Sequence, residues 1–218
     1  MVVTGRLSLF LVSTGPGAFA AKASWLSLVS PFALIGWCWI GFFVYWLYQA
    51  IGTKRTNKRE NVLRALPYRT ASVAGFICLN WSLGIPFLDR RRLPADTWIG
   101  VLALSLTFAG IAFAIWARRW IGRNWSSAVT IKEDHQLIRS GPYAWVRHPI
   151  YSGILSAMAG TALGIARYRG VVGAALFFLA FYLKSRIEES FMRQTFGVAY
   201  EEYRRTTGAF FPRLRRGR

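Results

Sequence analysis

Long stretches without a charged residue dominate the chain and predict membrane-spanning helices. A helix needs about 20 apolar residues to cross about 30 Å of hydrocarbon. Five uncharged stretches meet or approach this length and are separated by hydrophilic joints. They are residues 23–53, 70–88, 97–117, 149–166 and 170–183. We therefore predict an all-α integral membrane protein with about five transmembrane helices.

The distribution of basic residues between these stretches predicts an orientation. Six lysines and arginines follow the first stretch, six lie between the third and fourth, and nine lie from Lys184 onward. The other seven fall in the alternate segments. Cytoplasmic loops carry the excess of basic residues, so we expect the N-terminus outside and the C-terminus in the cytoplasm.

Composition agrees with a membrane protein and changes the meaning of the charge. Hydrophobic residues make up 54% of the 218 residues, ten are tryptophan, and the mean hydropathy is +0.30. A formal charge of +19 would suggest nucleic acid in a soluble protein. Beside apolar spans, basic residues instead set topology and contact anionic headgroups, so we expect the lipid bilayer as partner and no nucleic acid. Both cysteines lie in apolar stretches and fit no metal spacing, so we expect no metal.

Small residues recur at spacings of three and four along the fourth stretch. Gly153, Gly160 and Gly164 belong to this stripe, together with Ser152 and Ser156. Small side chains let helix backbones approach closely in membranes. We interpret the stripe as a packing surface, because nothing in it requires a ligand.

The only two histidines, His135 and His148, lie in the longest hydrophilic joint. Gly141-Pro142 predicts a turn, and Pro149 pushes His148 toward extended geometry at the start of the fourth helix. The first N–H groups of a helix are available to polar ligands. The residues alone leave a ligand site and a polar helix entry equally open.

A second polar cluster follows the fifth apolar stretch. Residues 170–183 cover about 21 Å as a helix, and then come Lys184, Arg186, Glu188 and Glu189. Lys184 and Glu188 share one helix face, whereas Glu189 points about 100° away and is expected to matter less. Ionisable groups at this depth face a polar cavity or each other. An ordinary ion pair with a snorkelling lysine and a meeting with the histidine joint both remain open.

Two ordered groups of residues carry a family pattern. The joint holds His135, Gly141-Pro142-Tyr143 and Arg147-His148-Pro149-Ile150-Tyr151-Ser152-Gly153. Downstream lie Glu188-Glu189, Phe196-Gly197, Tyr200, Tyr203 and Pro212. Together, in order and at this separation over residues 120–213, they resemble the isoprenylcysteine carboxyl methyltransferase family, which is related to phospholipid methyltransferases.

The resemblance implies an S-adenosyl-L-methionine site built from helix ends and the joint, in a cytoplasmic cofactor-binding region followed by a C-terminal helix. It implies the catalytic residues Lys184, Arg186 and Glu188. It implies the cofactor-binding residues His135, Gln136, Leu137, Ile138, Tyr143, His148, Pro149, Ile150, Tyr151 and Glu188. The family has an arginine where this chain has Lys184. Lysine lacks the fork that grips a carboxylate at two points, so a carboxylate acceptor is not predicted from this position.

The expected organisation has three parts. Residues 1–24 form an N-terminal leader, residues 25–117 three transmembrane helices, and residues 118–218 a methyltransferase core with two transmembrane helices and the C-terminal helix. We expect a lipophilic acceptor such as an isoprenylcysteine carboxylate, a phospholipid amine or a thiol. The expected location is the bacterial inner membrane. The alternatives are an NADPH-dependent membrane reductase of the sterol reductase type and a non-enzymatic protein that binds anionic lipid.

The charge distribution generates a topology prediction. A reporter fused after Arg218 should report the cytoplasm, because the basic segments face that side. A reporter in the joint at residues 90–92 should report the opposite side. The measurement is the activity of a paired enzyme reporter in whole cells, and a cytoplasmic signal from the joint would contradict five spans.

Overall fold

A computed structural model describes residues 30–51, 56–59, 61–94, 96–122, 125, 130–132 and 136–213. The expected leader, residues 1–24, and His135 lie outside the described residues. Side chains are not described at 56–59 or 130–132.

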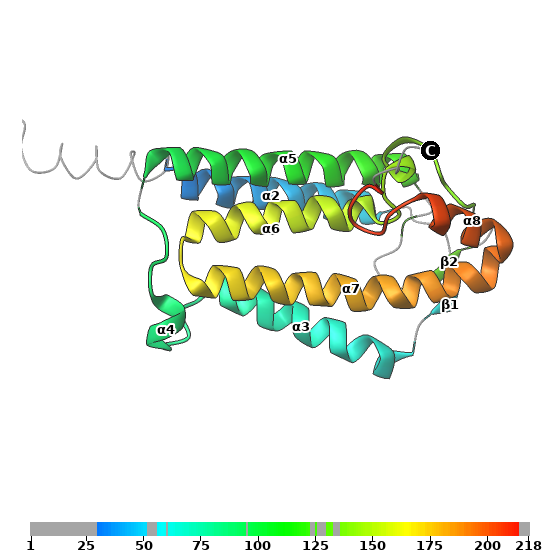
Figure 1. Cartoon of the computed structure of the whole chain (residues 1–218), viewed down its shortest axis with the longest axis horizontal. Coiled ribbons are helices and arrows are strands. Elements are labelled where there is room, and N and C mark those ends of the chain that lie inside the picture. Colours follow the sequence, from blue (N-terminus) through cyan, green and yellow to red (C-terminus); the bar gives the residue numbers. More distant parts are fainter. Residues whose placement is uncertain are drawn as a thin grey trace, which may run out of the picture.

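Five long helices lie side by side in two groups (Figure 1). The first group holds α2 (Pro31–Ala50), α5 (Thr97–Ile121) and α6 (Pro149–Ile165). The second holds α7 (Tyr168–Phe196) and α3 (Val62–Asn80). The α6 helix packs against α5 and α7, so it joins the two groups.

Short elements complete the two ends of the bundle. The α4 helix (Pro86–Asp89) lies at one end, and α8 (Val198–Thr206) at the other (Figure 1). The 3-10 turn η2 (Gly141–Ala144) precedes α6, and β1 (Thr56–Arg59) pairs antiparallel with β2 (Thr130–Lys132). The end with α8 also holds the start of α6 and the end of α7. The two polar clusters of the sequence therefore lie at one end of the molecule.

The expected helices are present, but two of them have other bounds than expected. The helix expected at 70–88 runs from Val62 to Asn80, because the Asn61 side chain caps it by accepting from the Leu63 N–H. The fifth helix does not end at residue 183; α7 continues to Phe196 through the charged residues. Charge ends a hydrophobic span but not a helix, because lysine, arginine and glutamate are good helix formers.

Three of the helices, α2, α5 and α7, are long and apolar enough to cross a membrane. The α6 helix is apolar but shorter, at 17 residues. The described part of the chain is therefore a bundle of helices, and two short strands lie in the joints between them. The count of about five spans stays a prediction.

Glycines allow the α5 and α6 backbones to touch. A Cβ added at Gly153 would lie 2.6 Å from both the Ala114 nitrogen and the Gly110 oxygen, and one at Gly110 would lie 2.5 Å from the Gly153 oxygen. Gly160 is equally crowded by Thr107. The interpretation of the small-residue stripe as a packing surface is confirmed, and this contact sets where α6 begins.

We expect Gly153→Ala to destabilise the bundle, although alanine is the better helix former, because its methyl group has no space against α5. The cost should be about 1–3 kcal/mol, as for overpacked cores. The measurement is thermal unfolding in detergent, followed by circular dichroism. The matched control is Gly36→Ala in α2, where nothing lies within 4 Å of an added Cβ. Equal melting temperatures for the two variants would contradict the packing argument.

Candidate active site

The C-terminal segment holds the start of α6 in place. The backbone N–H groups of Arg147 and His148 donate to the carbonyl oxygens of Gly208 and Ala209 at 2.8 and 3.0 Å. In α6, the Ser152 hydroxyl donates to the Phe210 carbonyl at 2.7 Å. The extended geometry expected for His148 before Pro149 is wrong, because its φ of −123° and ψ of 59° lie outside the extended region. Pairing with a segment about 60 residues later in the chain holds this entry to α6 in place.

A buried ion pair joins this loop to α7. Arg147 donates through Nε and Nη2 to Glu189 Oε1 at 3.0 and 2.7 Å, with 10% and 7% of the two side chains exposed. The other Glu189 oxygen lies 3.3 Å from Arg204 Nε of α8. Arg147 also donates to the carbonyls of Arg204 and Thr207. Glu189 therefore binds α7 to α8 and to the loop before α6.

The His148 imidazole lies between two carboxylates. Its Nε2 is 3.3 Å from Glu189 Oε1, and its Nδ1 is 3.4 Å from Glu188 Oε2. The ring also stacks on Tyr151 with an interplanar angle of 8°. We expected Glu189 to matter less than Glu188 for the site, because it points about 100° away on the helix. This geometry does not support that expectation, since both carboxylates contact the His148 ring.

These neighbours change the pKa of His148. Burial acts to lower its pKa, but the hydrogen bonds and negative charges of Glu188 and Glu189 outweigh burial and raise the pKa above its ordinary value. The imidazolium form is favoured. Two carboxylates at this distance from one ring are tolerated because that cation separates them.

Glu188 is the less buried of the two adjacent acids. Tyr151 donates its hydroxyl to Glu188 Oε1 at 2.5 Å. About 21% of the Glu188 side chain is exposed, against 7% for Glu189. The two adjacent acids therefore differ in their surroundings. Glu189 is enclosed by cations, whereas Glu188 is oriented by Tyr151 and His148 and is more exposed.

Lys184 lies one turn before Glu188, between two aromatic rings. Its Nζ is 5.7 Å from the centroid of Tyr68 and 5.5 Å from that of Tyr151. Tyr68 is buried on α3, so the first half of the chain contributes to this part of the site. Arg186 is exposed beside Tyr182 and does not join the cluster.

The remaining expected residues line the start of α6. Tyr143, in η2, is buried with Ile150 and Ala117, and Ile138 packs against this group. The Tyr143 carbonyl accepts from the Tyr203 hydroxyl at 2.6 Å. Burial, with a further contribution from Glu188, raises the pKa of Tyr143, which therefore stays a neutral phenol.

Three other expected residues have simpler surroundings. Pro149 is fully buried as the first residue of α6. Gln136 is exposed, and Leu137 is half-buried. None of the three is joined to the carboxylates by a described hydrogen bond.

Sequence reasoning missed several positions that build this site. Arg147 and Glu189 are within the quoted motifs, but nothing in the sequence distinguished them as a buried pair. The sequence features that could have indicated the pair are the arginine directly before His148-Pro149 and the two adjacent glutamates in a chain rich in cations. Tyr68 and residues 207–210 carried no signal, because their role depends on the packing of distant segments.

Comparison with known proteins finds sequence similarity to one family. The sequence model of the isoprenylcysteine carboxyl methyltransferase family matches residues 101–194. The chain is 27% identical to a protein-S-isoprenylcysteine O-methyltransferase of Xenopus laevis over 84% of the chain and 65% of that protein. It is 40% identical to a probable protein-S-isoprenylcysteine O-methyltransferase of Oryza sativa over 38% of the chain and 44% of that protein. The family resemblance is confirmed, and the reductase alternative is not favoured.

A bacterial relative has a different name. The chain is 35% identical to the cobalt-zinc-cadmium resistance protein CzcN of Cupriavidus metallidurans, over 54% of the chain and 53% of that protein. Within the described residues, no group of three or more His, Cys, Asp or Glu side chains is placed to hold a metal ion. The chain spans less than two thirds of the length of these three relatives.

The environment of His148 generates a pH prediction. Its folded pKa lies above the ordinary value of about 6.5, so its contribution to stability is complete below that pH and is lost as the pH rises through the raised pKa. The melting temperature in detergent should therefore fall as the pH rises above about 6.5. His148→Gln should show a smaller fall over this range. Equal slopes for the two proteins would contradict a charged His148.

Proposed function

We propose that this chain, whose residues 101–194 match the sequence model of the isoprenylcysteine carboxyl methyltransferase family, is a membrane methyltransferase that uses S-adenosyl-L-methionine and a lipophilic acceptor at the cytoplasmic face. The observation that carries the proposal is the Glu188 carboxylate, held by Tyr151 and His148 in a side chain that is 21% exposed. The acceptor class remains an isoprenylcysteine carboxylate, a phospholipid amine or a thiol.

The described residues fit such a cofactor. When bound, S-adenosylmethionine supplies an electrophilic methyl group on a sulfonium cation, and aromatic faces and a carboxylate are suited to a cation. Glu188 supplies the carboxylate, while Tyr151 and Tyr143 supply the aromatic groups beside it. We assign cofactor contact to these three residues, to the segment Gln136–Ile138 and to His148–Ile150, with His135 outside the described residues.

The chain's own contribution is positioning more than covalent chemistry. Methyl transfer needs donor and acceptor held in line, and such positioning supplies much of the reduction in the barrier. Glu188 cannot rotate freely, because Tyr151 and His148 each hold one of its oxygens. Glu189 in turn holds His148 from the opposite ring nitrogen. The orientation of Glu188 therefore depends on a chain of contacts that ends at a buried ion pair.

Lys184 is proposed to face the acceptor. Its ammonium group lies against Tyr68 and Tyr151, next to the Glu188 carboxylate on the same helix face. A lysine offers a point charge without the two-point grip of arginine, so it favours an acceptor that presents one polar atom. Arg186, also expected as catalytic, is directed toward the surface. We therefore assign the acceptor contact to Lys184 rather than to Arg186.

Glu188→Gln tests the proposal, because it keeps the size of the side chain and removes its charge. Binding of S-adenosylhomocysteine, measured by calorimetry in detergent, should weaken at least tenfold, about 1.4 kcal/mol. NADPH should not bind to the wild-type protein. Methyl transfer to a panel of isoprenylcysteine, phospholipid and thiol acceptors should be lost in the variant, with its melting temperature nearly unchanged.

Glu189→Gln is the matched comparison on the neighbouring residue. A neutral amide cannot balance buried Arg147, and leaving a buried charge unpaired costs about 3–5 kcal/mol. We expect this variant to lose thermal stability first and cofactor affinity only as a consequence. Unchanged cofactor affinity in Glu188→Gln, with loss of affinity in a stably folded Glu189→Gln, would reverse the two roles.

A further inference from the structure

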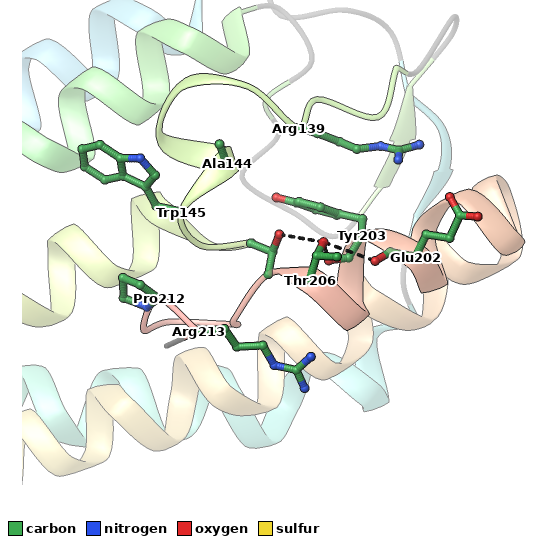
Figure 2. Close-up of a pocket in the computed structure, with 9 residues that line it drawn as sticks. Arg139, Ala144, Trp145, Glu202, Tyr203, Thr206, Pro212 and Arg213 are labelled. Carbon is green, nitrogen blue, oxygen red and sulfur yellow. Dashed lines mark hydrogen bonds between the residues drawn. The ribbon is translucent and has the colours of Figure 1, made fainter. Parts of the chain in front are cut away.

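A polar pocket lies between the end of η2, the α8 helix and the C-terminal segment (Figure 2). Its volume is about 560 Å³. Figure 2 shows Arg139 and Arg213 on opposite sides of Tyr203 and Thr206, with Trp145 at the far edge. Ala144, Glu202, Thr207 and Pro212 complete the lining. Tyr203 and Thr207 also bond to Tyr143 and Arg147, but none of the lining residues has a described hydrogen bond or ion pair with Glu188.

An apolar groove of about 620 Å³ runs along the outer face of α5. Its lining consists of Phe108, Ile111, Ala112, Ile115, Trp116, Arg119 and Trp120. From Phe108 to Trp120 the helix rises about 18 Å. That length is close to one half of a hydrocarbon core about 30 Å thick, the depth available to one acyl chain.

Aromatic contacts connect the groove to the pocket. The ring centroid of Trp116, in the groove, lies 5.5 Å from that of Trp145, in the pocket. Phe113 stacks on the same Trp145 ring. Trp120 donates its Nε1 hydrogen to the hydroxyl of Ser140, the neighbour of Arg139, at 3.2 Å. Trp145 keeps 56% of its surface exposed. The two hollows therefore meet along one row of tryptophans, the residue enriched where bilayer and water meet.

Both the groove and the pocket carry cations. Arg119 is at the end of the groove, and Arg139 and Arg213 line the pocket, against the single carboxylate of Glu202. Neither Arg119 nor Arg139 forms an ion pair with a carboxylate in the described part of the chain. Arg213 donates to the Arg205 backbone carbonyl, which leaves its charge uncompensated. An occupant with an apolar chain and an anionic head matches this surface.

We propose that the groove and pocket together bind one anionic phospholipid. One acyl chain lies along α5, the tryptophan row marks the depth of the glycerol region, and the phosphate enters the pocket lined by Arg139 and Arg213. This lipid is not the methyl acceptor, because the surface shares no residue with Glu188, Lys184 or Tyr151. It fastens η2 and the C-terminal segment, which hold the start of α6, to the membrane.

Native mass spectrometry of the full chain in detergent tests the headgroup contact, with phosphatidylglycerol and phosphatidylcholine as probes. Arg139→Gln/Arg213→Gln should weaken binding of one phosphatidylglycerol about tenfold and change that of phosphatidylcholine less than about twofold. The control is Arg64→Gln/Arg90→Gln, which removes the same charge from exposed positions far from the pocket. Equal weakening in both double variants would show a general charge effect and overturn the site.

A second pair of variants tests the groove without changing charge. Ala112→Trp fills the groove and should lower phosphatidylglycerol affinity, whereas Ala109→Trp, exposed on α5 but outside the lining, should not. The proposal would be overturned if Ala112→Trp bound phosphatidylglycerol as tightly as the wild-type protein. It would also be overturned if the protein bound glycerol 3-phosphate as tightly as phosphatidylglycerol, or if the mass spectrum showed two copies of the chain in place of one copy with one lipid. Thermal unfolding confirms that each variant is folded. Because lipid binding is measured without cofactor, failure here is distinct from failure of the proposed enzyme activity.

Discussion

The buried pair of Glu189 and Arg147 is the constraint on which the rest of the site depends. It joins α7 to the loop before α6, and the same carboxylate reaches Arg204 of α8. Removing one member of such a pair costs more than the pair contributes, because it leaves a charge without water or partner. The α7 helix, the α8 helix and the loop before α6 therefore keep one relative position. This arrangement fixes the positions of His148 and Glu188.

Two adjacent glutamates have different tasks because the helix turns about 100° between them. Glu189 turns toward α8 and becomes part of the framework. Glu188 turns toward Tyr151 and is the more exposed of the two. His148 contacts both and, as a cation, lets the two acids lie close together. A ligand that binds Glu188 therefore meets a carboxylate whose position is already determined.

The segment matched by the family, residues 101–194, does not build the site by itself. Tyr68 of α3 forms one side of the Lys184 position, and residues 208–210 hold the start of α6. Near the end of η2, the tryptophan row and its arginines present a surface suited to an anionic lipid. The site thus depends on a framework in which the bilayer itself is proposed to take part.

The sequence by itself determined the apolar helices, the packing stripe of α6 and the two polar clusters at one end of the bundle. These follow from local rules: helix length against bilayer thickness, small residues for close approach, and glycine and proline for turns. It placed α3 wrongly, because arginines within a helix look like a joint. Only the tertiary structure decided that Glu189 is buried with Arg147, that Tyr68 meets Lys184, and that Arg186 faces outward. The first two relations are contacts between residues 40 to more than 100 positions apart in the chain. The third depends on which face of α7 is covered by other helices, and helical periodicity carries no information about what covers a face.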